Sequence, residues 1–252
     1  MKISIAIQYY NRRDLLLTSL SSISNSCLIS DTEIIIVDDA SDYEHNIDDI
    51  SSVFPKLNIK LFKFTKEEKW WSCPVIPLNK SISECTGDVV ILQGAEIFYM
   101  NDIIKHAHDV IKDNDYLVYS CLALTKKGTD DLKNGIISQN KESIEQWYQH
   151  SVYRNACYNF CCAIKRKDLL DLGGFDERFA HGISHGDNDF ISRIKKKGMN
   201  VIQIDNLLTL HQYHQTMQVH PKDGHLCDEV LFNHILKTES GYKIKNSFIY
   251  ES

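Results

Sequence analysis

The chain of 252 residues lacks several features that would assign it to a broad class. It has no apolar run near the roughly 20 residues that a membrane-spanning helix needs, so we expect no membrane span. It also lacks a long block of lysine and arginine, and its net charge is −6. Because nucleic-acid binding usually depends on a basic surface, nucleic acid is not an expected partner.

The eight cysteines include no Cys-x-x-Cys pair, which argues against a zinc site built from thiolates. Residues 1–7 are typical of a β-strand and lack the cleavage site of a secretory signal peptide. We therefore expect reduced thiols and a cytoplasmic location. No internal repeat or low-complexity segment is found.

A hydrophobic content of 43% is sufficient for a large buried core, and we expect one domain over residues 1–252. Four apolar runs predict strands, and leucines and isoleucines at helical spacing separate the first two. The four runs are residues 3–8, 33–41, 58–64 and 88–93. This alternation predicts an α/β fold with a parallel sheet.

Polar residues follow three of these strands, at 8–11, 38–41 and 93–96. In open parallel sheets, ligands bind outside the carboxyl ends of the strands. We therefore expect these three stretches to line one crevice.

A second group of signals lies between Gly173 and Arg193. Residues 159–164 predict a strand and 165–172 a helix that stops at Gly173. A further helix is expected to begin near Asp187, with Asp189 close behind it. A carboxylate at a helix N-terminus is stabilised by free backbone N–H groups, so capping alone is one interpretation of this pair.

Four motifs together carry a family resemblance: Tyr-Asn-Arg at 10–12, Val-Asp-Asp-Ala-Ser at 37–41, Gly-Gly-Phe-Asp-Glu-Arg-Phe at 173–179 and Gly-Asp-Asn-Asp-Phe at 186–190. Over about residues 1–215 the chain resembles the family 2 glycosyltransferases of the GT-A fold. Its last block is similar to the C-terminal segment of β-galactosyltransferases. The resemblance implies a Rossmann-like nucleotide-binding half, about 1–125, continuous with an acceptor-binding and catalytic half, about 126–252.

The resemblance implies inverting transfer of a sugar from a nucleotide diphosphate sugar, most simply a UDP-sugar, to a hydroxyl of a glycan or other acceptor. Asp187 matches the general base of the family. Asp189 matches a second acid that contacts sugar hydroxyls, although pairing with Arg193 one helical turn later is the alternative.

Seven residues match the nucleotide-binding positions of the family: Gln8, Tyr10, Asn11, Asp38, Asp39, Asn79 and Gln93. Asp39 is expected to accept a hydrogen bond from the base, which suits the N3–H of uracil. Asn79 falls where the family has an Arg-Asn pair, but Leu78 replaces the arginine. One contact to phosphate is therefore expected to be missing.

The family usually carries Asp-x-Asp after the fourth strand, where two carboxylates hold Mn²⁺ or Mg²⁺ against the diphosphate. This chain has Gln-Gly-Ala-Glu at 93–96, so only Glu96 remains as a carboxylate. In related enzymes a downstream histidine reaches the metal, and both His211 and His214, which follow a predicted strand at 201–204, are candidates. Histidines that only make hydrogen bonds in a loop are the alternative.

Amphipathic rings are concentrated at Trp147, Tyr148 and His150, which we interpret as acceptor-binding residues because aromatic faces stack on sugars. The missing Asp-x-Asp keeps a second class open, an inactive module that binds nucleotide sugars or carbohydrates. A nucleotidyltransferase would need a loop rich in glycine and lysine after the first strand, and residues 9–12 do not form one.

Overall fold

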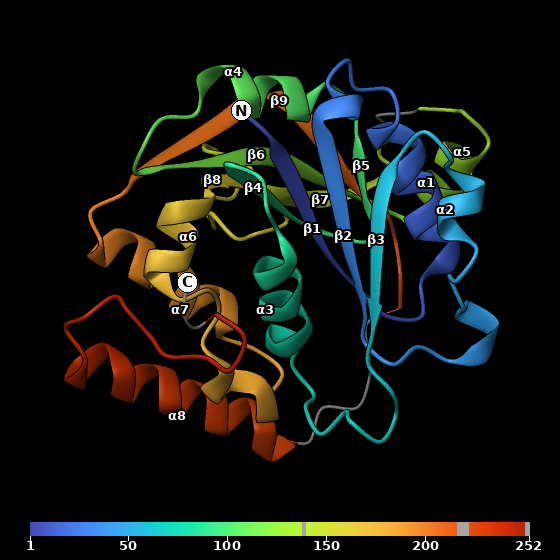
Figure 1. Ribbon diagram of the computed structural model, residues 1–252. Coiled ribbons are helices and arrows are strands. Elements are labelled where there is room, and N and C mark those ends of the chain that lie inside the picture. The colour runs from blue at the N-terminus through green and yellow to red at the C-terminus, as the bar shows by residue number, and fades with distance from the viewer. Residues whose placement is uncertain (138–139, 216–221, 250–252) are drawn as a thin grey trace.

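A computed structural model describes residues 1–137, 140–215 and 222–249 of the chain. Its centre is a nine-stranded sheet with the strand order β3-β2-β1-β4-β8-β6-β9-β5, and β7 pairs with β6 beside this path (Figure 1). The strands are β1 (Ile3–Tyr9), β2 (Thr32–Asp38), β3 (Asn58–Lys63), β4 (Val89–Gly94), β5 (Ile97–Tyr99), β6 (Asp115–Leu124), β7 (Ile144–Gln149), β8 (Cys161–Lys165) and β9 (Asn200–His211).

Helices cover the sheet and connect its strands. They are α1 (Arg13–Ile23), α2 (Ile50–Val53), α3 (Val75–Glu84), α4 (Ile103–Val110), α5 (Lys126–Lys133), α6 (Arg166–Leu172), α7 (Gly186–Lys196) and α8 (Lys222–Thr238). Three short 3-10 segments, Ile29–Asp31, Tyr43–His45 and Glu177–His181, lie in connecting loops. Within the described part of the chain, no helix is both long and apolar enough to cross a bilayer.

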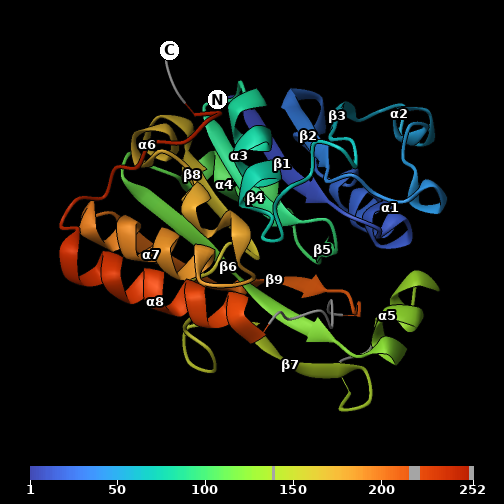
Figure 2. The same ribbon diagram turned by 90° about the horizontal axis from the view of Figure 1, so that it is seen from below.

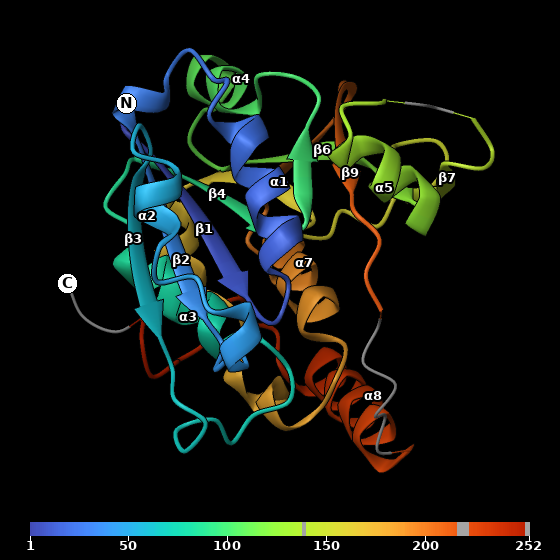
Figure 3. The same cartoon turned by 90° about the vertical axis from the view of Figure 1, so that its right-hand side faces the viewer.

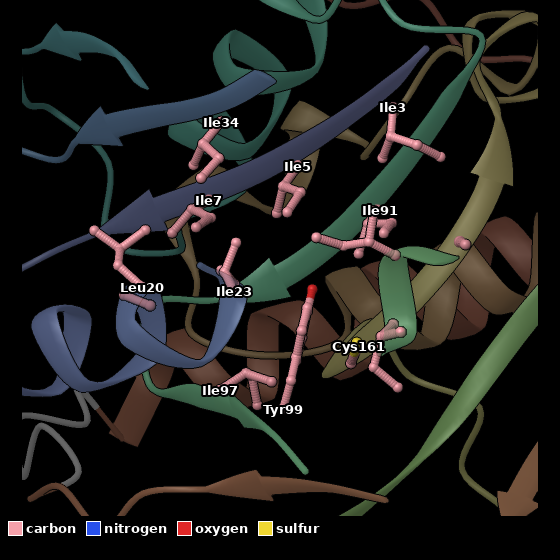
Figure 4. Packing of buried hydrophobic residues seen from close by; sticks show 14 of the residues in the cluster. Ile3, Ile5, Ile7, Leu20, Ile23, Ile34, Ile91, Ile97, Tyr99 and Cys161 are labelled. Carbon is pink, nitrogen blue, oxygen red and sulfur yellow. The ribbon is translucent and has the colours of Figure 1, made fainter. Parts of the chain in front are cut away.

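The four predicted strands pair in parallel with one another, with β1 between β2 and β4 and with β3 at the edge; β6 and β9 form a second parallel pair. Side chains alternate along β1, so that Ile3, Ile5 and Ile7 face α1 while Ala6 faces α3. Figure 4 shows Leu20 and Ile23 of α1 against this first face. Figure 3 shows α1 lying across the sheet on this side. The α/β prediction is confirmed.

The second half adds antiparallel pairing, because β8 runs antiparallel to both β4 and β6. The predicted strand at 159–164 is found as β8, and α6 ends as expected at Gly173, whose φ of 80° is left-handed. The strand predicted at 201–204 is longer and runs to His211. The polar residues Asp205 and Asn206 interrupt its apolar pattern, but they lie in residues 205–207, which bulge out where the pairing of β9 with β6 shifts register.

Candidate active site

The three loops expected at the carboxyl edge of the sheet do meet. The backbone N–H of Asn11 donates to Ser41 Oγ at 3.0 Å, and its side-chain amide donates to Asp42 Oδ2 at 2.6 Å. Arg12 donates from Nη1 to Glu96 Oε2 at 3.0 Å. Hydrogen bonds therefore join the ends of β1, β2 and β4 into one site, as the strand pattern predicts.

Glu96, His211 and His214 form a group of three metal-ligating side chains. His211 Nε2 lies 3.1 Å from Glu96 Oε1, and His214 Nε2 lies 3.9 Å from the same oxygen. All three ligand atoms are within 4.8 Å of one another. Metal–ligand bonds of roughly 2.0–2.2 Å place neighbouring ligands about 3 Å apart, so a small closing movement of His214 would let all three hold one ion.

Charge at this group is balanced by Arg12. Burial alone would raise the pKa of Glu96, but the Arg12 guanidinium and the His211 ring outweigh it and hold that pKa well below its usual range. Burial and the nearby Arg12 charge lower the pKa of His214, which favours the neutral ring that binds metals. Glu96 is thus an anion with one oxygen toward Arg12 and the other toward the histidines.

Asp187 lines a small cavity of about 150 Å³ together with Glu96 and His211. It is the second residue of α7, where His185 takes the capping position; the His185 ring bonds Ser184 Oγ at 2.8 Å and makes no capping hydrogen bond to the helix. Asp187 is an exposed residue at this cavity, yet protein atoms surround its carboxyl group, and the partial loss of hydration raises its pKa to about 6.

Asp189 points away from the cavity into the interior. Its Oδ2 accepts a hydrogen bond from Arg193 Nε at 2.6 Å, and both side chains are buried. Arg193 also donates to the carbonyl oxygens of Leu172 and Gly174, which ties α7 to the glycine turn. The structure thus shows the ion pair that was the alternative for Asp189, and does not bring this carboxylate to the cavity.

Asp39 lies at the end of β2 with both oxygens engaged. Trp71 Nε1 donates to Oδ1 at 2.7 Å and Lys69 Nζ donates to Oδ2 at 2.9 Å. Burial raises the pKa of Asp39, although Lys69 partly offsets it. The Lys69 ammonium also lies 3.9 Å from the centre of the Tyr10 ring. Lys69 therefore occupies one face of the Tyr10 ring and one oxygen of Asp39, the two groups expected to contact the base.

Three other expected nucleotide contacts have internal partners instead. Asn79 is fully buried, accepts from the N–H of Phe175 and donates to its carbonyl oxygen, so it supports the glycine turn rather than reaching for phosphate. The Gln93 side chain bonds Tyr99 and Ser19 inside the core. Asp38 accepts from the N–H of Ser41.

Gln8, Leu78 and Gln93 line the 150 Å³ cavity, Gln93 despite its bonds to Tyr99 and Ser19. Leu78 offers no charge for a phosphate, as expected.

A larger cavity of about 480 Å³ lies beside the metal-ligating group and is lined by Tyr148, His211 and His214. The Tyr148 ring lies 4.7 Å from that of His211. Trp147 and His150 are not among the described residues that line either cavity. Because neighbours on a strand face opposite ways, Trp147 instead packs on a separate apolar cluster and stacks on Tyr153.

Two site residues were not predicted, Arg12 and Lys69. Arg12 stands in the Tyr-Asn-Arg motif, so its position was visible, but its pairing with Glu96 was not. Lys69 lies in the acidic and basic stretch 66–69, which reads as an ordinary solvated loop.

The sequence matches glycosyl transferase family 2 over residues 4–173. This match spans more than half of the chain, and the protein belongs to that family. No curated protein gives a significant match. The similarity of the C-terminal segment to β-galactosyltransferases is not confirmed by these comparisons.

Solved structures show the same fold at low sequence identity. Staphylococcus aureus TarS 1–349 in complex with UDP matches with a TM-score of 0.63 and 16% identity over 84% of this chain and 61% of that one. GalNAc-T7 with UDP, GalNAc and Mn²⁺ matches with a TM-score of 0.63 and 17% identity, over 87% of this chain and 45% of that one.

The mannosyltransferase PcManGT from Pyrobaculum calidifontis, in complex with GDP-Man and Mn²⁺, matches with a TM-score of 0.58 and 16% identity, over 87% of this chain and 58% of that one. This chain thus spans less than two thirds of each of these three solved chains. The comparisons establish the GT-A glycosyltransferase fold.

Proposed function

We propose that the protein transfers a sugar from a UDP-sugar to a hydroxyl of a glycan or other acceptor, by inverting single displacement. The observation that carries this proposal is that Asp187 and the Glu96–His211 pair line the same small cavity. A carboxylate base on one side and a cation-binding group on the other are what sugar transfer from a diphosphate requires.

Asp187 acts as the general base in this proposal and removes the proton of the attacking hydroxyl. A pKa raised to about 6 makes it a stronger base than an ordinary aspartate while leaving it ionised at neutral pH. Tyr10 and Asp39 are proposed to bind the uracil, with Lys69 displaced by the incoming base. A carboxylate has about four lone-pair sites, so Asp39 can accept one more hydrogen bond while keeping that of Trp71.

Glu96, His211 and His214 are the residues that would hold a divalent cation, and the donor chemistry favours Mn²⁺ over Mg²⁺. Mg²⁺ takes oxygen ligands and water, whereas this group offers two imidazoles and one carboxylate. Mn²⁺ in the GalNAc-T7 and PcManGT structures supports this choice. When bound, the ion would neutralise charge on the departing diphosphate, and Arg12 beside Glu96 adds a further positive charge there.

The larger cavity is proposed to receive the acceptor, with Tyr148 as its aromatic wall. It adjoins the small cavity at His211, which lines both. An acceptor placed there would lie next to the proposed donor sugar.

The test is a panel of UDP- and GDP-sugars incubated with the purified chain and Mn²⁺, with release of nucleotide and the anomeric configuration of the product followed by NMR. We expect turnover with a UDP-sugar and inversion at the anomeric carbon. Asp187→Asn serves as the matched control, since it should bind donor but not turn it over. Tight donor binding without hydrolysis or transfer by the wild type would instead identify an inactive binding module, the alternative that the absent Asp-x-Asp suggests.

A further inference from the structure

The C-terminal helix α8 contacts the loop that leads into α7. Figure 2 shows α8 alongside α7. From α8, the carboxylate of Asp228 reaches the backbone just ahead of α7: its Oδ2 accepts hydrogen bonds from the N–H of Ile183 at 2.7 Å and of Ser184 at 2.8 Å. Asp228 is only 3% exposed, so these are buried, charge-assisted contacts.

Gly182 makes room for this carboxylate. A Cβ built on Gly182 would lie 1.7 Å from Asp228 Oδ1, far inside contact distance. Any side chain at Gly182 would therefore push Asp228 away from the loop. The fit of a glycine backbone against a buried carboxylate fixes the distance between α8 and residues 182–184.

The same loop turns sharply before the catalytic helix. His185 has a φ of 67°, a left-handed conformation that is uncommon for a residue with a side chain, and its ring lies 5.4 Å from that of Phe232 on α8. Asp187 follows two residues later. In the described part of the chain its carboxylate has no hydrogen bond or ion pair with another side chain, and crowding by protein atoms raises its pKa.

We propose that Asp228 is a positioning residue for Asp187: by holding the backbone of Ile183 and Ser184, it sets the entry of α7 and hence the place of the base. This inference rests on the proposed function of Asp187. It assigns to α8 a role in the chemistry, although α8 itself contributes none of the described cavity-lining residues. Asp228 acts on Asp187 only through the backbone of residues 183–186. A small shift of that backbone is enough, because displacement of a base by about 1 Å can reduce a rate about 100-fold.

Three variants test the proposal. Asp228→Ala removes the acceptor, Asp228→Asn keeps an oxygen that can accept both N–H groups, and Gly182→Ala displaces the carboxylate without altering it. Two variants serve as matched controls. Asp102→Ala removes another carboxylate that accepts two backbone N–H groups, those of Lys105 and Cys27, at α4. Gly241→Ala adds a methyl group where no heavy atom lies within 4 Å.

Two of the measurements do not depend on turnover by the enzyme. Hydrogen exchange at the Ile183 and Ser184 amides should rise by about tenfold or more in Asp228→Ala and Gly182→Ala as the loop opens. The carboxyl carbon of Asp187, followed by NMR, should titrate near 6 in the wild type and closer to about 4 in these variants, because water enters.

Four groups whose titration depends on the charge of Asp187 do not obscure this signal. They are the thiols of Cys73 and Cys162 and the hydroxyls of Tyr116 and Tyr158, and the pKa of each is raised, chiefly by burial. All four therefore stay neutral over the range in which Asp187 titrates. Glu96 and His211 line the same cavity, so the carboxyl carbon of Asp187 itself is the signal to follow.

The kinetic readout separates positioning from general stability. We expect kcat to fall by about 10- to 100-fold in Asp228→Ala and Gly182→Ala. The Kd for UDP should change less than twofold, and Asp228→Asn should restore most of kcat. Unchanged hydrogen exchange at Ile183 and Ser184 in Asp228→Ala would overturn the proposal. So would faster exchange in a variant whose Asp187 titration and kcat both stay at the wild-type values. A wild type without turnover would contradict the proposed function alone, since exchange and titration would still decide the role of Asp228.

Discussion

His211 Nε2 lies 3.1 Å from Glu96 Oε1, which joins the last residue of β9 to the turn after β4. The contact follows from strand pairing, because His211 is the direct partner of Ile97 across β5 and β9. A histidine from the second half of the chain thereby stands beside the single carboxylate that remains where the family usually has two. We propose that the group of Glu96, His211 and His214 takes the place of Asp-x-Asp in this protein.

We expect Glu96→Gln and His211→Ala each to raise the Mn²⁺ concentration for half-maximal rate by at least about tenfold, since even second-shell changes around a metal typically cost 10- to 100-fold in affinity. Mn²⁺ binding by EPR measures the same loss without turnover. The control is His106→Ala, which alters a half-buried histidine of α4 that bonds Tyr119 of β6. Full wild-type activity in excess chelator would contradict a metal requirement and leave Arg12 to neutralise the leaving group.

Asp39→Ala should weaken UDP binding by about 1–3 kcal/mol, the range for losing a hydrogen bond to a charged group. Calorimetry with the folded variant measures this. Because Asp39 also holds Trp71, Trp71→Phe is the matched control: it removes the indole N–H but keeps the carboxylate. Equal losses in both variants would show that loop packing, and not recognition of the base by Asp39, sets the affinity.

Asp187→Asn should lower kcat by about 10²–10⁴-fold, the usual contribution of a positioned base, while UDP affinity and stability stay close to wild type. If the carboxylate served only to stabilise the start of α7, turnover would be normal, because asparagine stabilises a helix start about as well as aspartate. Normal turnover would therefore remove Asp187 from the mechanism.

The pH dependence of the wild type follows from the raised pKa of Asp187. The base acts only when ionised, so the rate should be full well above pH 6 and fall as the pH drops through about 6. An unperturbed aspartate would lose activity only near about pH 4. A pH profile of kcat/KM for the free enzyme distinguishes the two values.

Asp189 is expected to matter for stability more than for chemistry. Asp189→Ala leaves the Arg193 charge buried and unpaired, which should cost about 3–5 kcal/mol in the free energy of unfolding by urea. Asp187→Asn, two residues earlier in α7, is the matched comparison, and it should cost little. A stable Asp189→Asn variant that loses turnover as strongly as Asp187→Asn would show that Asp189 acts on the sugar after all.

The sequence by itself determined the parallel strands β1 to β4 and the edge of the sheet where the site lies. Continuous apolar runs specify the buried parallel strands, because such strands are covered on both faces and have no polar side to confuse the pattern. Gly173 marked the end of α6, and the start of α7 beside Asp187 was visible from local helix signals. These features depend on neighbours in the chain, so a local pattern is enough to predict them.

The tertiary structure decided which polar side chains are free to act. Asp189 and Asn79 look like site residues in the sequence, yet Arg193 and Phe175 engage them inside the fold. The pairing of β5 with β9 brings His211 to Glu96, and the fold carries Asp228 to the entry of α7. Asp189 and Arg193 are one helical turn apart, and their pairing was already one interpretation of the sequence. The other partners are far apart in the chain, and a buried polar group is held by whichever partner the packed fold places within hydrogen-bond distance.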